Sequence, residues 1–467
     1  MKRIIIIGGG ISGLSTAWIL KSRALSEGID LDIRLLEREE RVGGKIWSIR
    51  DSGFLCEWGP NGFLDNKPQT LELCTRLGAD GELLRSNDNA RKRFIFSGRK
   101  LHRLPENGPS FLKSDLISWP GKLRLAMEPL IPKYTGGGDE TLASFGRRRL
   151  GEEALRKLIA PMVSGIFAGD PETMSLKSCF PRIAELEEVY GGLIRAMVRL
   201  AKQKKREIAE GKVVASAAGP GGILTSFRGG IQTLTDIIAD QLGPAIVTPG
   251  AAVSKIERSS DGTFRIVSTH GEIEGDGVIV AAPAYAAASM LRESAPGVAE
   301  LLDGIPYSSM TVVCFGYERG RIPHDLNGFG YLIPREEGLS TLGTLWDSSI
   351  FEHRAPEGMV LLRSMMGGAC FPQYITLSDD EVIRRVRADL EKTMGIREKP
   401  DFIRIFRHEK AIPQYVVGHS RRLDALSDQL SRVPGIFLTG NSYRGIGLND
   451  CVAAAHRAVE QTISFIG

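Results

Sequence analysis

Cysteine is scarce in this sequence, and long apolar runs are missing. The six cysteines lie far apart and form no C-x-x-C pair; they are Cys56, Cys74, Cys179, Cys314, Cys370 and Cys451. This usage favours buried thiols in a reducing compartment over a disulfide framework, and it argues against a disulfide reductase. No apolar run approaches the roughly 20 residues that a membrane-spanning helix needs, so any membrane contact is expected at the surface.

Strong charge and metal-binding patterns are missing as well. The net charge of +4 is small for 467 residues, and the seven histidines show no metal-ligand spacing. These features favour neither nucleic-acid binding nor a metal centre. The composition, 42% hydrophobic and 25% charged, is typical of a globular protein. A chain of this length is expected to form two or three domains. Because the first strand is predicted to begin at residue 3 or 4, we expect no signal peptide.

The N-terminal 37 residues carry the clearest motif. Four isoleucines at residues 4–7 predict a buried parallel strand, and residues 14–20 predict a helix. Between them lies a G-x-G-x-x-G motif made of Gly8, Gly9, Gly10, Ile11, Ser12 and Gly13. Its glycines allow a tight turn and close approach of a pyrophosphate to the helix N-terminus. A second predicted strand, residues 32–36, ends at Glu37, whose spacing from Gly13 suits a carboxylate that binds ribose hydroxyls.

A second glycine motif indicates which dinucleotide is bound. Arg41-Val42-Gly43-Gly44 follows the acidic residue. This R-x-G-G resembles the second signature of the FAD-dependent amine oxidase and porphyrinogen oxidase superfamily, which nicotinamide dehydrogenases do not usually carry. FAD, bound non-covalently, is therefore the expected cofactor.

The end of the chain narrows the resemblance. Residues 440–451, GNSYRGIGLNDC, resemble the closing flavin motif of the protoporphyrinogen oxidase family. Other stretches agree with that family: 59–64 (GPNGFL), 165–169 (GIFAG), 178–181 (SCFP), 328–334 (GFGYLIP) and 412–419 (IPQYVVGH). The resemblance covers nearly the whole chain. It implies an α/β fold, α+β overall, with a discontinuous Rossmann-like FAD domain, an antiparallel-sheet substrate domain and a helical membrane-facing subdomain.

The expected domain boundaries follow the motifs and the changes in pattern along the chain. We expect the FAD domain in residues 1–66, 223–295 and 406–467, and the substrate domain in residues 67–103 and 296–405. The helical subdomain is expected in residues 104–222. Within these, residues 67–86 predict a helix, residues 204–222 a flexible link, and residues 226–231 the start of another helix.

The resemblance also implies the binding residues. The flavin is expected to contact residues 8–13 and a further set: Glu37, Arg38, Gly43, Gly44, Lys45, Gly59, Pro60, Asn61, Gly62, Val253, Asn441, Ile446, Gly447 and Leu448. The helix that follows residue 448 would point its positive end at reduced flavin. Cys451 is expected to be a buried thiol and not a flavin attachment. For substrate, the family pattern implies Arg93, Asn61, Gly165, Phe329, Leu332, Met365 and Ile412. Arg93 would pair with a tetrapyrrole propionate, because a guanidinium meets a carboxylate bidentately.

The implied activity is oxidation of protoporphyrinogen IX to protoporphyrin IX in haem biosynthesis. Three two-electron rounds would each move a hydride to flavin, with no dedicated side-chain base and with oxygen as acceptor. Oxidation of coproporphyrinogen III by a close relative is the nearest alternative. That enzyme would need to accommodate four propionates instead of two. An amine oxidase and a non-catalytic binding protein on the same scaffold are more distant alternatives.

The expected location is the bacterial cytoplasm with peripheral contact to the membrane. Residues 104–135 interleave apolar and basic side chains as a lipid-contacting surface would, although a self-packed helical subdomain explains the same pattern. The oligomeric state stays open, a homodimer included.

Overall fold

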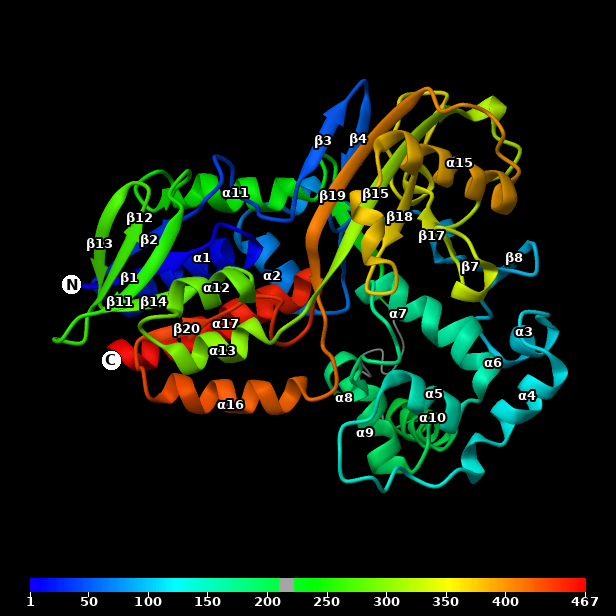
Figure 1. Ribbon diagram of the computed structural model, residues 1–467, viewed down its shortest axis with the longest axis horizontal. Coiled ribbons are helices and arrows are strands. Elements are labelled where there is room, and N and C mark those ends of the chain that lie inside the picture. The colour runs from blue at the N-terminus through cyan, green and yellow to red at the C-terminus, as the bar shows by residue number, and fades with distance from the viewer. Residues whose placement is uncertain (210–221) are drawn as a thin grey trace.

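The structure is a computed structural model that describes residues 1–209 and 222–467 (Figure 1). The predicted link at 204–222 falls largely outside the described residues. Its first part is helical instead, because helix α10 continues from Leu193 to Ala209.

A five-stranded parallel sheet forms the core of the nucleotide-binding part. Its strands, in spatial order, are β10 (Val247–Thr248), β2 (Leu31–Leu36), β1 (Lys2–Ile7), β14 (Gly277–Val280) and β20 (Ile436–Leu438). Side chains alternate across the sheet, so Ile4 and Ile6 pack into one apolar core while Ile5 and Ile7 pack into another. This placement confirms the predicted buried parallel strand.

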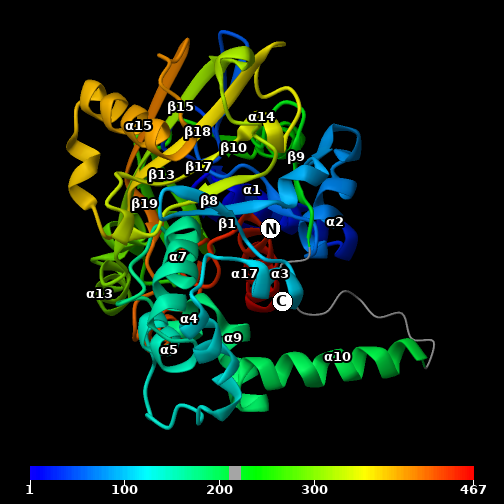
Figure 2. The same cartoon turned by 90° about the vertical axis from the view of Figure 1, so that its right-hand side faces the viewer.

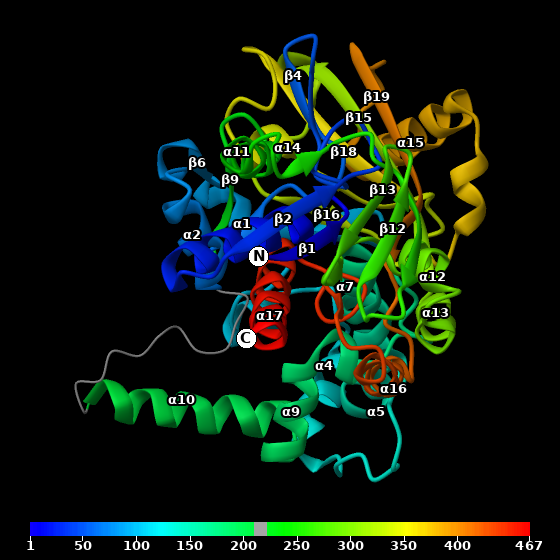
Figure 3. The same cartoon turned by 90° about the vertical axis from the view of Figure 1, so that its left-hand side faces the viewer.

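Helices and a small sheet cover the two faces. The core around Ile4 is closed by α1 (Ile11–Glu27), α11 (Gln232–Leu242) and α17 (Leu448–Ile466). The core around Ile5 is closed by the antiparallel sheet β11 (Val253–Arg258), β12 (Phe264–Ser268) and β13 (Gly271–Gly275) with α12 (Ala284–Leu291), α13 (Pro296–Asp303) and α16 (His419–Ser431). Figure 3 shows the small sheet and α17 beside the parallel strands.

A seven-stranded sheet forms the second part of the molecule. Its order is β19 (Phe402–Pro413), β15 (Tyr307–Glu318), β18 (Met359–Gly367), β17 (Thr341–Leu345), β16 (Gly330–Leu332), β7 (Arg93–Ser97) and β8 (Lys100–Arg103). All neighbours are antiparallel except β16 and β7. Helix α15 (Asp379–Met394) packs on one face. A parallel and a largely antiparallel sheet confirm the predicted fold class, while β19 runs through the boundary expected at residue 406.

The helical part lies below this sheet in Figure 1. It contains α3 (Gly108–Lys113), α4 (Trp119–Ala126), α5 (Leu142–Arg149), α6 (Glu152–Ala154), a π-helical turn (Leu155–Ile159), α7 (Ala160–Phe167), α8 (Leu176–Cys179), α9 (Pro181–Tyr190) and α10. Its own core includes Leu142, Phe145 and Val163. Across the described ranges, the helices are all too short or too polar to cross a bilayer.

Two local predictions were wrong. The helix expected over 67–86 is α2 (Pro68–Arg76), because Gly78 takes a left-handed φ of +69° and residues 83–85 join strand β9 (Leu224–Phe227) as β6 (Leu83–Arg85). Residues 226–227 therefore end a strand, and the helix begins only at Gln232, after Gly230 with φ +100°. Further short elements, besides single 3-10 turns, are β3 (Ser48–Asp51), β4 (Phe54–Glu57), β5 (Phe63–Leu64) and α14 (Asp347–Ile350).

Candidate flavin and substrate site

The glycine-rich turn after β1 requires its glycines. A Cβ on Gly13 would lie 1.9 Å from the carbonyl oxygen of Gly8, and a Cβ on Gly9 would lie 2.9 Å from Cβ of Glu37. The turn leaves the first amides of α1 without side-chain caps, so the helix N-terminus is available to an anion.

Glu37 stands at the carboxyl end of β2, beside this turn. Its carboxylate accepts hydrogen bonds from the backbone N–H groups of Gly9 and Glu39, and the residue is buried. The backbone of Glu37 also bonds Thr248 at the end of β10, which leads towards Val253 at the start of β11. Arg38 differs from the other predicted cofactor residues nearby, because its side chain is exposed and pairs with Glu39 at 2.8 Å.

The R-x-G-G turn packs directly on the first loop. The N–H of Gly43 donates to the carbonyl of Gly9 at 2.8 Å, and Gly43 and Gly44 both have positive φ. The Arg41 guanidinium donates to the Gly44 carbonyl at 2.8 Å and stacks on Trp47, 4.3 Å from the ring centroid. Arg41 therefore shapes the turn.

Lys45 joins the nucleotide part to the seven-stranded sheet. Its Nζ donates to the carbonyls of Lys410, at 2.9 Å, and Ala411 in β19. Burial lowers the pKa of Lys45 to about 8. A Cβ on Gly59 would lie 2.3 Å from the Lys45 carbonyl, so the loop of Gly59, Pro60, Asn61 and Gly62 runs against this junction.

The C-terminal motif returns to the first loop. Gly440 lies near Ser12, and α17 begins at Leu448 after Gly447, close to the predicted start at residue 449. Leu448 packs in the nucleotide core, whereas Ile446 packs against the core of the helical part. The carbonyl of Asn441 accepts a hydrogen bond from the Tyr415 hydroxyl at 2.6 Å. The Cys451 thiol is buried, which raises its pKa to about 11, as expected of a structural thiol.

These features fit the predicted cofactor. The uncapped amides of α1, the close approach allowed at Gly9 and Gly13, and the Glu37 carboxylate suit a dinucleotide. Lys45, the 59–62 loop and residues 440–448 would hold the flavin end. Bound FAD would supply two-electron chemistry at that end.

The strand registers bring several predicted substrate residues onto one sheet face. Leu332 pairs with Gly343, Gly343 with Met365, and Met365 with Val312. Paired residues share a face, so Leu332 and Met365 lie on the same side. Ile412 packs in the same apolar cluster as Met365. Gly165 on α7 covers this face, since a Cβ there would lie 2.8 Å from Leu332.

Arg93 lies one row further along this face. It is two residues before Ile95 on β7, and Ile95 pairs with Leu332. Its guanidinium lies 5.1 Å from the ring centroid of Phe329. Arg93 is exposed, although partial desolvation by neighbouring residues lowers its pKa, and the described residues give it no acidic partner within 4.0 Å. The structure thus places Arg93, Leu332 and Met365 on one face of the sheet, with Phe329 beside Arg93.

Sequence reasoning missed the residues that hold the 59–62 loop. Arg363 on β18 donates to the Gly59 carbonyl at 3.0 Å and pairs with Asp347 at 2.9 Å. The Asn61 side chain donates to Asp347 at 3.4 Å. No local signal could identify Asp347 or Arg363, because neither belongs to a recognised motif. Tyr415 does lie in one, the stretch 412–419.

Comparison with known proteins agrees with this geometry. The family described as flavin containing amine oxidoreductase matches residues 11–463. The coproporphyrinogen III oxidase of Bacillus subtilis is 32% identical, with 100% of this chain and 98% of the relative covered. The chloroplastic protoporphyrinogen oxidase of Nicotiana tabacum is 31% identical, covering 99% and 85%.

Solved structures show the same fold. A crystal structure from Exiguobacterium sp. 255-15, named as a candidate protoporphyrinogen oxidase, superposes with a TM-score of 0.82 at 28% identity, covering 98% of each chain. A reduced UDP-galactopyranose mutase superposes with a TM-score of 0.75 at 18% identity, covering 99% of this chain and 96% of that one, which bears on the fold alone. The chain is an FAD-dependent oxidase, and it belongs to the flavin-containing amine oxidoreductase family.

Proposed function

We propose that the protein oxidises protoporphyrinogen IX to protoporphyrin IX in three two-electron rounds, with oxygen as the electron acceptor. The observation that carries this proposal is Arg93. It presents a guanidinium without an acidic partner among the described residues, at the edge of an apolar sheet face. A flat apolar macrocycle with carboxylate side chains matches a surface of that kind.

The side chains around the reacting region are suited to binding and orientation. Leu332, Met365 and Ile412 offer apolar contacts to the macrocycle. Arg93 would fix its orientation through a propionate. The pyrrole N–H groups of the substrate can release the protons, so the chain needs no side-chain base for the oxidation.

Coproporphyrinogen III is the second candidate substrate. The full-length match to the Bacillus subtilis coproporphyrinogen III oxidase favours it. Initial rates on both porphyrinogens, each with and without oxygen, separate the two. We expect faster oxygen-dependent turnover of protoporphyrinogen. Faster turnover of coproporphyrinogen selects the second candidate, and turnover of neither refutes both.

We also propose peripheral contact with an anionic membrane through the helical part. Trp119 and Leu123 on α4 are 71% and 66% exposed, and Leu130 is 74% exposed. Of the basic residues interleaved with them in the sequence, Lys122 is buried and Arg124 donates to backbone carbonyls, whereas Lys113 and Lys133 are exposed. Phe111, in contrast, packs on the cluster of Ile95 and Leu116 and is not part of this surface.

Helix α10 supports the same proposal. It extends away from the rest of the molecule (Figure 2). Arg195, Arg199, Lys202 and Arg206 follow one stripe of the helix, Met197 and Ile208 are exposed on the opposite side, and Val198 is exposed beside the basic stripe. An amphipathic helix of this kind suits an anionic lipid surface.

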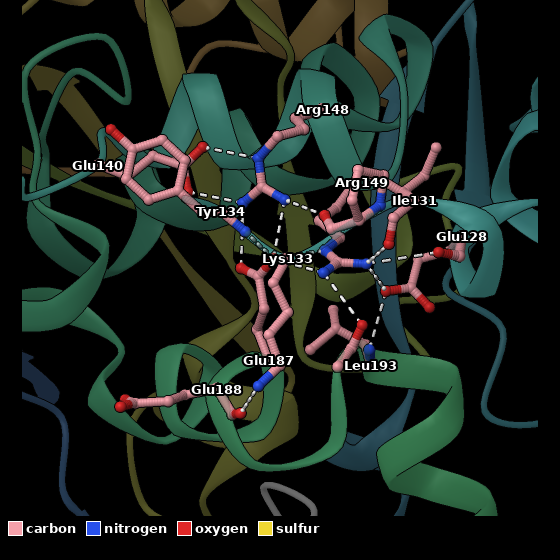
Figure 4. Close-up of polar contacts among 12 residues, drawn as sticks. Glu128, Ile131, Lys133, Tyr134, Glu140, Arg148, Arg149, Glu187, Glu188 and Leu193 are labelled. Carbon is pink, nitrogen blue, oxygen red and sulfur yellow. Dashed lines mark hydrogen bonds and ion pairs between the residues drawn. The ribbon is translucent and has the colours of Figure 1, made fainter. Parts of the chain in front are cut away.

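A buried charge network fixes the root of α10 (Figure 4). Arg149 is fully buried and pairs with Glu128 at 3.2 Å. Glu128 in turn accepts hydrogen bonds from the N–H groups of Leu193 and Ile194 at 2.9 and 3.1 Å. Because these are first-turn amides of α10, the network sets the direction in which the helix leaves the body.

A further inference from the structure

Buried charged side chains hold the loop that carries Asn61. Glu57, Asp347 and Arg354 are fully buried, and Arg363 is 3% exposed. Arg354 pairs with Glu57 at 3.3 Å, and Arg363 pairs with Asp347 at 2.9 Å. Charges are rarely buried in such number without a compensating role, because removing each from water is costly.

This cluster connects the two sheets at the flavin loop. Glu57 ends β4 and accepts the N–H of Ile231 at the start of the α11 segment, at 3.0 Å. Arg363 comes from the substrate sheet and donates to the carbonyls of Glu57, at 3.3 Å, and Gly59, at 3.0 Å. The position of the 59–62 loop is therefore set by the substrate sheet.

Asp347 also sets which way the Asn61 amide faces. Burial raises the pKa of Asp347, while the Arg363 guanidinium, paired with it at 2.9 Å, and the Arg354 guanidinium favour its ionised form. An ionised carboxylate can only accept, so the amide nitrogen of Asn61 must face it, at 3.4 Å. The amide oxygen then faces the other way. That oxygen is buried and has no hydrogen-bond partner among the described residues.

We propose that Asp347, held by Arg363, is a positioning residue that turns the Asn61 oxygen towards an N–H donor of a bound ligand. Two N–H donors fit this role: an N–H group of reduced flavin and a pyrrole N–H of the porphyrinogen. A buried acceptor without a donor is unfavourable, and a ligand N–H would satisfy it. A flavin donor requires only that FAD binds, whereas a pyrrole donor rests on the proposed function.

The variants are Asn61→Ala, Asp347→Asn and the double variant, with Asp389→Asn as control. Asp389 is a matched buried carboxylate on the opposite face of the sheet. It accepts hydrogen bonds from the backbone N–H groups of Ser340 and Thr341. Asp347→Asn keeps the shape but lets the Asn61 amide turn over, because the new side chain can both donate and accept. We expect the control to change turnover by less than about twofold.

The first measurement is the midpoint potential of bound FAD without substrate. If the donor is flavin, Asn61→Ala weakens binding of the reduced form by about tenfold relative to the oxidised form, which lowers the potential by about 30 mV. Asp347→Asn lowers it in the same direction, and the double variant goes no further than Asn61→Ala alone.

The second measurement is kcat and KM on the porphyrinogen that the parent protein turns over. If the donor is a pyrrole, both single variants lower kcat/KM by about tenfold at unchanged potential, and their effects do not add. Should the parent oxidise neither porphyrinogen, the proposed function fails while the potential still tests the flavin donor.

The proposal is overturned if Asp347→Asn changes neither quantity, or if its effect adds fully to that of Asn61→Ala. If Asp347→Asn fails to fold, Arg363→Lys takes its place. It keeps the charge next to Asp347 but loses part of the fork that binds the Gly59 carbonyl. A partial loss in the same quantity that Asn61→Ala changes supports the proposal, and an unchanged value overturns it.

Discussion

Replacing Arg93 with alanine tests the substrate class and the pose together. The guanidinium stacks on Phe329 and finds no acidic partner among the described residues, so its loss should cost the free protein little stability. Arg93 is exposed at the start of β7, so a carboxylate would meet a largely solvated charge. An exposed ion pair contributes about 0–1 kcal/mol, less than the roughly 1.5–3 kcal/mol of a hydrogen bond to a buried charge.

We therefore expect a loss of up to about 1 kcal/mol in substrate binding, which raises KM by up to about fivefold. The flavin spectrum should not change, because Arg93 lies on the substrate sheet. Arg93→Lys should restore part of the affinity, since lysine keeps the charge without the bidentate fork.

The assay is steady-state oxidation of protoporphyrinogen and of its propionate diester by parent and variant. Esterification removes the carboxylates, so parent and Arg93→Ala should have similar KM values on the diester. An equal impairment of the variant on both substrates would refute the reasoning, because Arg93 would then support structure and not a propionate.

Three further changes have defined outcomes. Glu37→Ala should weaken FAD binding by roughly ten- to a hundredfold in titrations of the flavin-free protein, and an unchanged Kd would remove the ribose assignment. Burial lowers the pKa of Lys45 from 10.5 to about 8, so between these pH values the unfolded chain holds a proton that the folded chain lacks. The free energy of unfolding of the flavin-free parent, measured by urea denaturation, should therefore rise with pH more steeply than that of Lys45→Met. Parallel plots of this free energy against pH would contradict the prediction. Trp119→Ser with Leu123→Ser should reduce sedimentation with phosphatidylglycerol vesicles by about tenfold or more while FAD stays bound. Leu25→Ser changes a similarly exposed leucine on α1 and should leave sedimentation with the vesicles unchanged. An equal loss of sedimentation in both variants would favour a self-packed helical part.

The sequence alone determined the features that depend on local spacing. The turn between β1 and α1 needs glycine at Gly9 and Gly13 whatever the rest of the chain does, and Glu37 follows from the length of one strand–helix–strand unit. The apolar run at residues 4–7 likewise required burial on both faces. Local pattern was less reliable where pairing decided the outcome. Residues 83–85 have a helical pattern but form a strand, because β9 offers them a hydrogen-bonding edge.

Only the tertiary structure decided how the site is held together. Arg93, Leu332 and Met365 share a face because of strand registers between segments far apart in the chain. The pairing of Asp347 with Arg363, and of both with the loop of Asn61, depends on how β18 and α14 meet the end of β4. Such contacts leave no periodicity or spacing in the sequence, because each charge is compensated by a residue that folding alone brings near.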